Sequence, residues 1–422
     1  MARNGNESDE MIRRLFSGAI SAVAVIALAA PACAQVASAA EPTDELEIQP
    51  IMDLRARFET VDQGALDAEA LTVRLRAGAE AKIGHFALLA EAEANVALID
   101  DYNAFAFPLL GESQRRPQYA VIPDPENAEL NRLQLQYRSQ AGTLTVGRQR
   151  ISLDDQRWVG PVGWRQNEQT FDAVRGEGRV GPLSLDLSYA ISQRTIFGED
   201  AGPRTAFDGD FLLAGVAAAQ GPIQGKLFAY LLDYDEAFLF ANSSQTYGGI
   251  ISGSVAIAPE TRISLRASYA RQSDLGDNPF DYSASYWALE AGTTLSGFTL
   301  AGGWEQLGSD NERAVQTPMA TLHKFNGWAD VFLMTPPAGL EDSYVSIARN
   351  FGRRGPLEAI TAQLAFHQFD SALGDVEYGT EWDASVGFGI GRFRILAKYA
   401  DYRAVGFGTN TRKFWLQAEW SL

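Results

Sequence analysis

Residues 71–83 read LTVRLRAGAEAKI, and this stretch decides the fold. Its odd-numbered positions carry only Leu, Val, Ala and Ile, while most of its even-numbered positions carry Thr, Arg, Glu or Lys. A period of two predicts an extended strand with one apolar and one polar face. The same alternation returns at 183–191 and at 263–269, so strands, not helices, organise the chain.

About eighteen such segments follow one another. Short turns such as 180–182 and 258–260 alternate with longer polar stretches such as 99–127 and 193–209. In a soluble sandwich the apolar faces would meet a second sheet, whereas in an outer-membrane barrel they meet lipid and the polar faces line a wet lumen. Short turns at one end and long loops at the other favour the barrel. We therefore predict an all-β, transmembrane, antiparallel up-and-down β-barrel of about 18 strands.

The two ends of the chain carry processing and assembly signals. Residues 11–34 fit a secretory signal peptide, with the true start at Met11 as an alternative to Met1; a membrane anchor or a lipid-modified Cys33 fits less well. The expected organisation is a signal peptide over 1–34, a short segment over 35–49 and an outer-membrane barrel over 50–422.

The last segment resembles the C-terminal signal of barrels that the outer-membrane assembly machinery recognises, with Leu422 in place of the more usual Phe. The expected location is the outer membrane of a Gram-negative bacterium. The partners are the assembly machinery, membrane lipid and lipopolysaccharide.

Composition excludes several classes of protein. The 35 basic and 53 acidic residues give a net charge of −18, which excludes a nucleic-acid binder that relies on a basic face. One Cys and three His make a Cys/His zinc site untenable, so no metal or cofactor is expected. His85, His323 and His367 lie in separate segments, far in sequence from an evident nucleophile, so we do not expect an enzyme.

Arginine dominates the positive charge. Lysine occurs only at five positions, so 35 − 5 = 30 of the basic residues are arginine, and many fall on polar strand faces. Guanidinium groups hold carboxylates through paired hydrogen bonds, so lumenal arginines such as Arg57, Arg74 and Arg132 suit anionic solutes. Alternatively, the arginines pair with lumenal acids and simply solvate the interior. The two roles are compatible. The candidate acids are Asp53, Glu59, Glu80, Glu91 and Glu93.

Segment 147–179 is the densest polar stretch. Its Gly147-Arg148-Gln149 start, the 154–157 run DDQR, the 164–167 run WRQN and the 170–175 run TFDAVR resemble the hallmark of the alginate export family. The resemblance implies an arginine-lined channel for a polyuronate. It places the following residues in or near the constriction: Arg148, Arg150, Arg157, Arg165, Arg175, Asp154, Asp155, Glu168 and Asp172.

The register of this segment is not simple. Leu144 and Val146 should face lipid, which by parity turns Arg148 and Arg150 outward, where a midplane arginine costs about 2–4 kcal/mol. Either a bulge at Gly147 reverses the faces or these residues lie above the membrane belt. The segment is either part of the wall or a loop folded into the pore.

The expected function is a passive outer-membrane channel for an anionic saccharide or small anionic solute. The alternative is a general diffusion porin for small nutrients without polymer preference. A transporter with a plug domain is disfavoured because residues 35–49 are too few for a plug.

Overall fold

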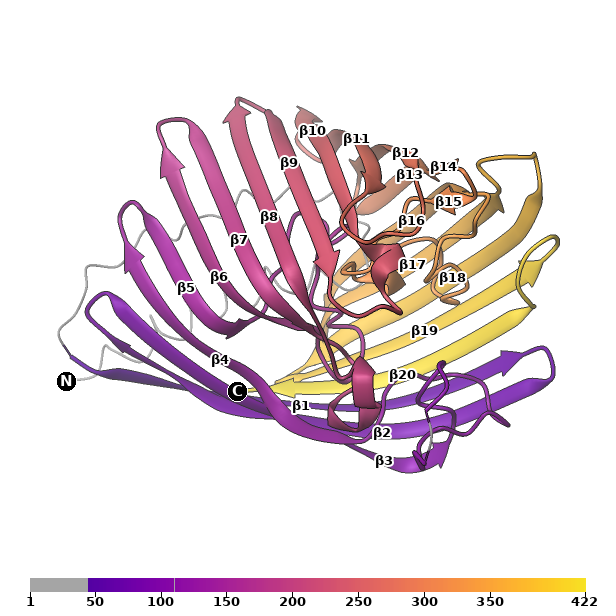
Figure 1. The fold of residues 1–422 in the computed structure, drawn as a ribbon, viewed down its shortest axis with the longest axis horizontal. Coiled ribbons are helices and arrows are strands. Elements are labelled where there is room, and N and C mark those ends of the chain that lie inside the picture. Colours follow the sequence, from indigo (N-terminus) through magenta and orange to yellow (C-terminus); the bar gives the residue numbers. More distant parts are fainter. Residues whose placement is uncertain (1–44, 110) are drawn as a thin grey trace.

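The chain forms one closed wall of antiparallel strands (Figure 1). The computed structural model describes residues 45–109 and 111–422, and within them eighteen strands pair into one sheet. Strand β1 (Glu47–Gln63) pairs with the last strand, β20 (Thr411–Ser421), which closes the sheet on itself. A closed sheet leaves no backbone edge unpaired, as a bilayer-spanning sheet requires. The predicted barrel of about 18 strands is confirmed.

The other wall strands follow in chain order. The first eight of them are β2 (Leu66–Ile83), β3 (Phe86–Asp101), β4 (Asn127–Ser139), β5 (Gly142–Gln149), β6 (Thr170–Val180), β7 (Leu183–Arg194), β8 (Ala206–Gln220) and β9 (Ile223–Tyr234). The next eight are β10 (Ser244–Ala258), β11 (Thr261–Asp274), β12 (Ser283–Leu295), β13 (Phe298–Leu307), β16 (Leu340–Arg354), β17 (Leu357–Asp370), β18 (Glu377–Ile390) and β19 (Phe393–Ala404).

Short elements lie in the connections. Strands β14 (Ser309–Asp310) and β15 (Arg313–Ala314) form a separate hairpin, and the 3-10 helices are η2 (Glu199–Arg204), η3 (Phe240–Asn242) and η4 (Leu322–Lys324). None of the helices in the described residues is long and apolar enough to cross a bilayer.

The two ends of the barrel differ in their connections. At one end each hairpin is closed by two residues, as at 181–182 between β6 and β7, where Gly181 adopts a φ of 59° that glycine reaches without strain. The other end carries long connections at 102–126 and 195–205, although β1 and β2 are joined there by two residues only. Short turns mark the periplasmic end of a barrel and long loops the external end.

The two faces of the wall follow the predicted alternation. Leu187 and Leu265 point outward with exposed fractions of 54% and 60%, whereas Arg74 and Ser268 point into the lumen and are buried. The outer face therefore presents hydrocarbon to the bilayer. The wall begins at Glu47, so it includes the last three residues of the segment expected before residue 50. The signal peptide expected over 1–34 and the Met11 start lie outside the described residues.

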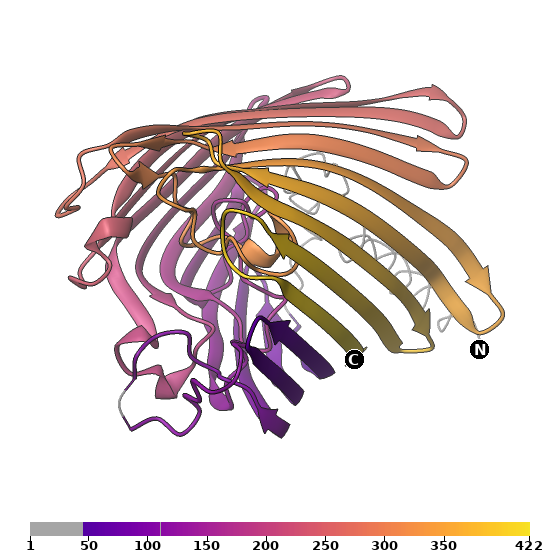
Figure 2. The ribbon, with the colours of Figure 1, turned by 90° about the vertical axis from the view of Figure 1, so that its right-hand side faces the viewer.

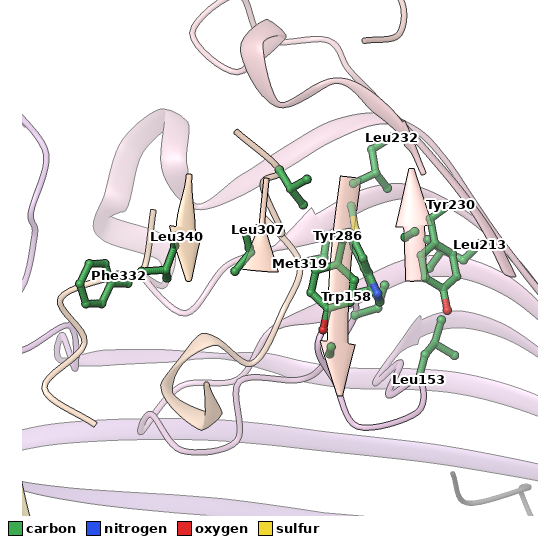
Figure 3. Packing of buried hydrophobic residues seen from close by; sticks show 14 of the residues in the cluster. Leu153, Trp158, Leu213, Tyr230, Leu232, Tyr286, Leu307, Met319, Phe332 and Leu340 are labelled. Carbon is green, nitrogen blue, oxygen red and sulfur yellow. The ribbon is translucent and has the colours of Figure 1, made fainter. Parts of the chain in front are cut away.

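Two long connections turn back into the barrel (Figure 2). We call residues 150–169 the first inserted segment and residues 308–339 the second inserted segment. Their apolar side chains fill part of the lumen against the wall: the ring centroid of Trp158 lies 5.1 Å from that of Tyr286 and 5.9 Å from that of Phe228. Figure 3 shows Trp158 beside Tyr286 and Met319 in this cluster. The lumen is thus partly a packed core.

Candidate functional site

The inserted segments hold each other inside the lumen. Val159 and Met319 form a parallel bridge, and the Gly160 N–H donates to the Met319 carbonyl at 2.9 Å. The Thr321 N–H in turn donates to the Gln156 carbonyl at 3.1 Å. Of the two alternatives for the hallmark stretch, its middle is a folded-in loop, while its ends continue as β5 and β6.

Arg157 fastens the first inserted segment to the second and to the wall. Its Nε donates to Glu305 of β13 at 2.8 Å, and its terminal nitrogens donate to Thr317 at 3.3 Å and Asn326 at 3.2 Å. The side chain is buried and lies 4.8 Å above the Phe325 ring. Because its donors are occupied by protein, Arg157 has a structural position, not one facing water.

Arg165 occupies a similar buried position. Its guanidinium pairs with Asp330 of the second inserted segment at 2.7 Å and with Glu59 of β1 at 3.4 Å. The neighbouring Gln166 N–H donates to Asp124 at 2.8 Å, which joins the segment to the external connection 102–126. Arg165 therefore ties three parts of the chain together.

Glu168 is the central acid of the first inserted segment. It accepts from Arg76 of β2 at 2.5 Å, from the Nε of Arg150 at 3.0 Å and from Asn131 at 3.2 Å. Burial alone would raise the pKa of Glu168, but Arg76 and Arg150 outweigh it and hold the pKa well below its usual range. The carboxylate is buried with 4% of its side chain exposed, whereas Arg150 keeps 34% exposed.

Two wall pairs repeat this arrangement along β4. Arg132 donates twice to Glu91, at 2.9 and 2.8 Å, and Arg138 donates to Glu80 at 2.7 Å. The exposed fractions of the side chains are 15% for Arg132 against 2% for Glu91, and 41% for Arg138 against 16% for Glu80. In each pair the guanidinium is the partner nearer the water. We call Arg138, Arg132 and Arg150 the arginine file.

The remaining wall arginines predicted to line the pore also point inward. Arg57 is buried, donates to Gln417 at 2.9 Å and lies 4.1 Å above the Trp164 ring. Arg74 pairs with Asp53 but leaves its Nε and Nη1 without a hydrogen-bond partner among the described residues. Arg175 holds Asp186 through two hydrogen bonds, of 3.1 and 2.6 Å.

The lumenal arginines also pair with lumenal acids, as in the alternative interpretation of the sequence. The pairs are Asp53 with Arg74, Glu59 with Arg165, Glu80 with Arg138, Glu91 with Arg132 and Glu93 with Arg76. The two adjacent acids of the first inserted segment behave in the same way: Asp154 pairs with Lys226 at 2.7 Å and Asp155 with Arg266 at 2.7 Å. These contacts anchor the segment to β9 and β11.

Arg148 and Asp172 are not brought to the lumen. The two side chains pair with each other on the outward face of β5 and β6, at 2.8 and 2.9 Å. Gly147 has a φ of 114°, yet β5 pairs with both neighbours without a register shift, so no bulge at Gly147 reverses the faces. The parity argument holds for Arg148. Arg150 comes after the strand and turns inward with the loop.

One group of contacts joins the wall to both inserted segments, and no single stretch of sequence predicted it. Lys398 of β19 lies 4.1 Å above the Trp164 ring and 3.7 Å above the Trp328 ring, and its Nζ is 2.8 Å from Nε2 of His323. His323 Nδ1 is 2.7 Å from Asp330. We call these residues the Lys398 clamp. The scarcity of lysine in the chain was the signal that could have pointed to it.

Both buried histidines therefore have acidic neighbours, which sequence separation concealed. His367 Nδ1 lies 2.9 Å from Asp342, and its Nε2 lies 3.8 Å from Asp383. Burial lowers the pKa of His323 well below its usual value, even though Asp330 opposes the shift. In the part of the chain that the structure describes, no serine or threonine hydroxyl is hydrogen-bonded to either imidazole.

The closed wall, its apolar outer face and its charged lumen define an outer-membrane β-barrel of the channel class. Residues 46–192 match the alginate export family, which confirms the resemblance carried by the hallmark stretch over that part of the chain.

Solved structures share the fold over almost the whole barrel. OpdQ of Pseudomonas aeruginosa is 13% identical with a TM-score of 0.68, and the match covers 89% of this chain and 99% of OpdQ. OccAB4 of Acinetobacter baumannii is 14% identical with a TM-score of 0.67, over 89% of this chain and 98% of its own. OpdK of P. aeruginosa, solved with vanillate, is 13% identical with a TM-score of 0.67, over 89% and 98% respectively. The comparison with curated proteins gave no match.

Proposed function

We propose that the protein is a passive channel that favours anionic solutes, with carboxylate-bearing saccharides such as polyuronates as the substrate class. The arginine file carries this proposal. In its three pairs the positively charged partner is the more exposed one, as with Arg150 at 34% against Glu168 at 4%.

The physical reason is the placement of charge. A buried carboxylate orients its arginine, and the planar fork of donors still offers free edges to the water side. A solute carboxylate that reaches such an edge gains a charge-assisted hydrogen bond without displacing the buried acid. Arg132 and Arg138 are six residues apart on β4, or about 20 Å, which suits successive contacts with an extended polyanion.

The comparisons support a carboxylate substrate from two directions. The matched family is named for alginate export, and OpdK was solved with vanillate, which carries a carboxylate. A passive pore imposes no direction of its own. The solute gradient therefore decides between uptake and export.

Planar-bilayer recordings in a salt gradient test the proposal. We expect a reversal potential on the anion-selective side and block by oligouronates, and we expect Arg150→Glu combined with Arg138→Glu to move the potential toward cation selectivity. Arg353→Gln, which removes an exposed arginine that pairs with Glu358, is the matched control and should leave it unchanged. Equal reversal potentials in the file variant and wild type, with equal passage of neutral and acidic oligosaccharides, would instead identify a general porin.

A further inference from the structure

An apolar groove runs across the outward face of the wall from the start of β9 to β13. Its volume is about 690 Å³, and its outward-facing lining includes Ile251, Leu265, Leu289 and Trp304. Leu265 and Leu289 are exposed by 60% and 50%, so the groove opens toward the bilayer. It lies on the opposite side of the wall from the arginine file and takes no part in the proposed pore.

Small residues create the groove. Gly253, Leu265, Ala291 and Gly302 are consecutive partners in the strand register, so three of these four neighbouring outward positions carry a glycine or an alanine. The next outward-facing pair along these strands, Leu289 and Trp304, lines the side of the groove. A Cβ on Gly253 would lie 3.4 Å from the nearest heavy atom outside its chain neighbours, an ordinary contact, so close packing does not require glycine there.

A cation marks the periplasmic side of the groove. Arg349 of β16 is the register partner of Phe298, the first residue of β13 after the turn at 296–297. Its guanidinium lies 4.3 Å above the Phe298 ring and 5.0 Å above the Phe351 ring. Arg349 makes no ion pair with a carboxylate within the described residues. Four residues, or about 13 Å, separate Phe298 from Gly302 along β13.

From this geometry we infer a binding site for one phospholipid of the inner leaflet. An acyl chain occupies the groove over Gly253, Ala291 and Gly302, and the lipid phosphate binds Arg349. Charge complementarity selects this occupant: an arginine without a carboxylate, fixed between two aromatic rings at the level of the headgroups, lacks an anion. A second copy of the barrel fits less well, because two convex walls touch along their ridges and leave a trough unfilled.

Native mass spectrometry of the intact barrel with added phosphatidylglycerol tests this site. We expect one retained lipid on the wild-type protein. The groove-filling variant Gly253→Leu with Ala291→Leu should weaken retention at least about tenfold. Arg349→Gln should weaken the retention of phosphatidylglycerol by a similar factor. It should leave the retention of diacylglycerol, which has no phosphate, unchanged.

Matched controls separate the site from general lipid contact. Ala90→Leu with Ala92→Leu adds similar bulk on the outward face of β3, and Arg353→Gln removes a neighbouring exposed arginine that pairs with Glu358. Both should retain the lipid as wild type does, and heat-modifiable gel mobility reports whether each variant is folded. Equal lipid retention in all folded variants, or a dimer that the groove-filling variant abolishes, would overturn the proposal.

Discussion

His323 stacks face to face on Trp164, with 4.4 Å between the ring centroids and 6° between the ring planes. The two residues come from different inserted segments, and Lys398 of the wall contacts both of them. A cation on an aromatic face is worth about 2 kcal/mol or more once it is removed from water. We therefore expect the Lys398 clamp to set how firmly the two segments are held inside the lumen.

Trp164→Ala should release this clamp. Truncating a fully buried tryptophan costs about 3–5 kcal/mol, and the partly buried Trp164 should cost less. The loss falls on the docking of the segments, because the closed backbone sheet is untouched. We expect larger and noisier single-channel conductance with an intact barrel. His85→Ala, at the exposed periplasmic turn, is the control. A conductance equal to that of the wild type would show that the stacked pair does not restrict the pore.

Arg157→Ala should destabilise the protein more than it alters selectivity. The substitution leaves Glu305 buried without its cation, a change that costs about 3–5 kcal/mol, and Arg157 itself does not face water. We expect a lower midpoint of thermal unfolding and an anion preference within error of wild type. Arg403→Ala, whose ion pair is exposed, should change stability by less than about 1 kcal/mol. A large shift in reversal potential in Arg157→Ala would instead show that Arg157 lines the constriction.

The alternation of side chains made the wall predictable. In 71–83 the type and parity of each residue predict the face on which its side chain lies, because the side-chain period is two and only one face meets lipid. Leu75 and Arg74 lie on the predicted faces. The same parity placed Arg148 outward. Long connections have no such period. Whether 150–169 is wall or loop depends on partners such as Met319, far along the chain.

The candidate site shows the same limit. Composition and the hallmark stretch found the arginines, and Arg150, Arg157 and Arg165 all lie within the barrel. Neither feature showed that Arg157 and Arg165 are buried in ion pairs while Arg150 remains partly exposed to solvent, because exposure depends on tertiary packing. The contact of His323 with Asp330 and Lys398 brings together residues up to 75 positions apart.

Stability should be insensitive to pH between 7 and 5 as far as Glu168 is concerned. Its pKa in the folded protein lies below the unfolded value of about 4.3, so its contribution is complete above that value and is lost as the pH falls through the folded pKa. We expect docking of the first inserted segment to weaken only below about pH 4. Glu168→Gln should remove that acid dependence and lower stability at neutral pH. The measurement is the urea midpoint from pH 7 to pH 3.

The exposed pair of Glu358 with Arg353 supplies the control for this titration. Glu358→Gln should leave the acid limb of the curve in place, because the side chains are exposed by 51% and 70%. An identical acid limb in Glu168→Gln and wild type would mean that another carboxylate controls the transition.

The ion pair between Arg148 and Asp172 should stabilise the barrel in lipid. Outward-facing Leu133, Val146 and Val174 surround it, each exposed by 45%, so the two charges stand among hydrocarbon. Asp172→Ala leaves Arg148 without its partner at a cost of about 2–4 kcal/mol near the midplane and less toward an interface. The urea midpoint of the barrel folded in lipid vesicles measures this cost, and its size reports the depth of the pair.

Two double variants separate charge pairing from the mere presence of charge. Exchanging the residues, Arg148→Asp with Asp172→Arg, should recover most of the loss because the bidentate pair reforms with reversed polarity. Replacing both with apolar residues, Arg148→Met with Asp172→Leu, should match or exceed the wild-type midpoint, since buried pairs often add little over well-packed hydrocarbon. If Asp172→Ala alone had no effect, the pair would lie in the headgroup region, where water and phosphate replace the lost carboxylate.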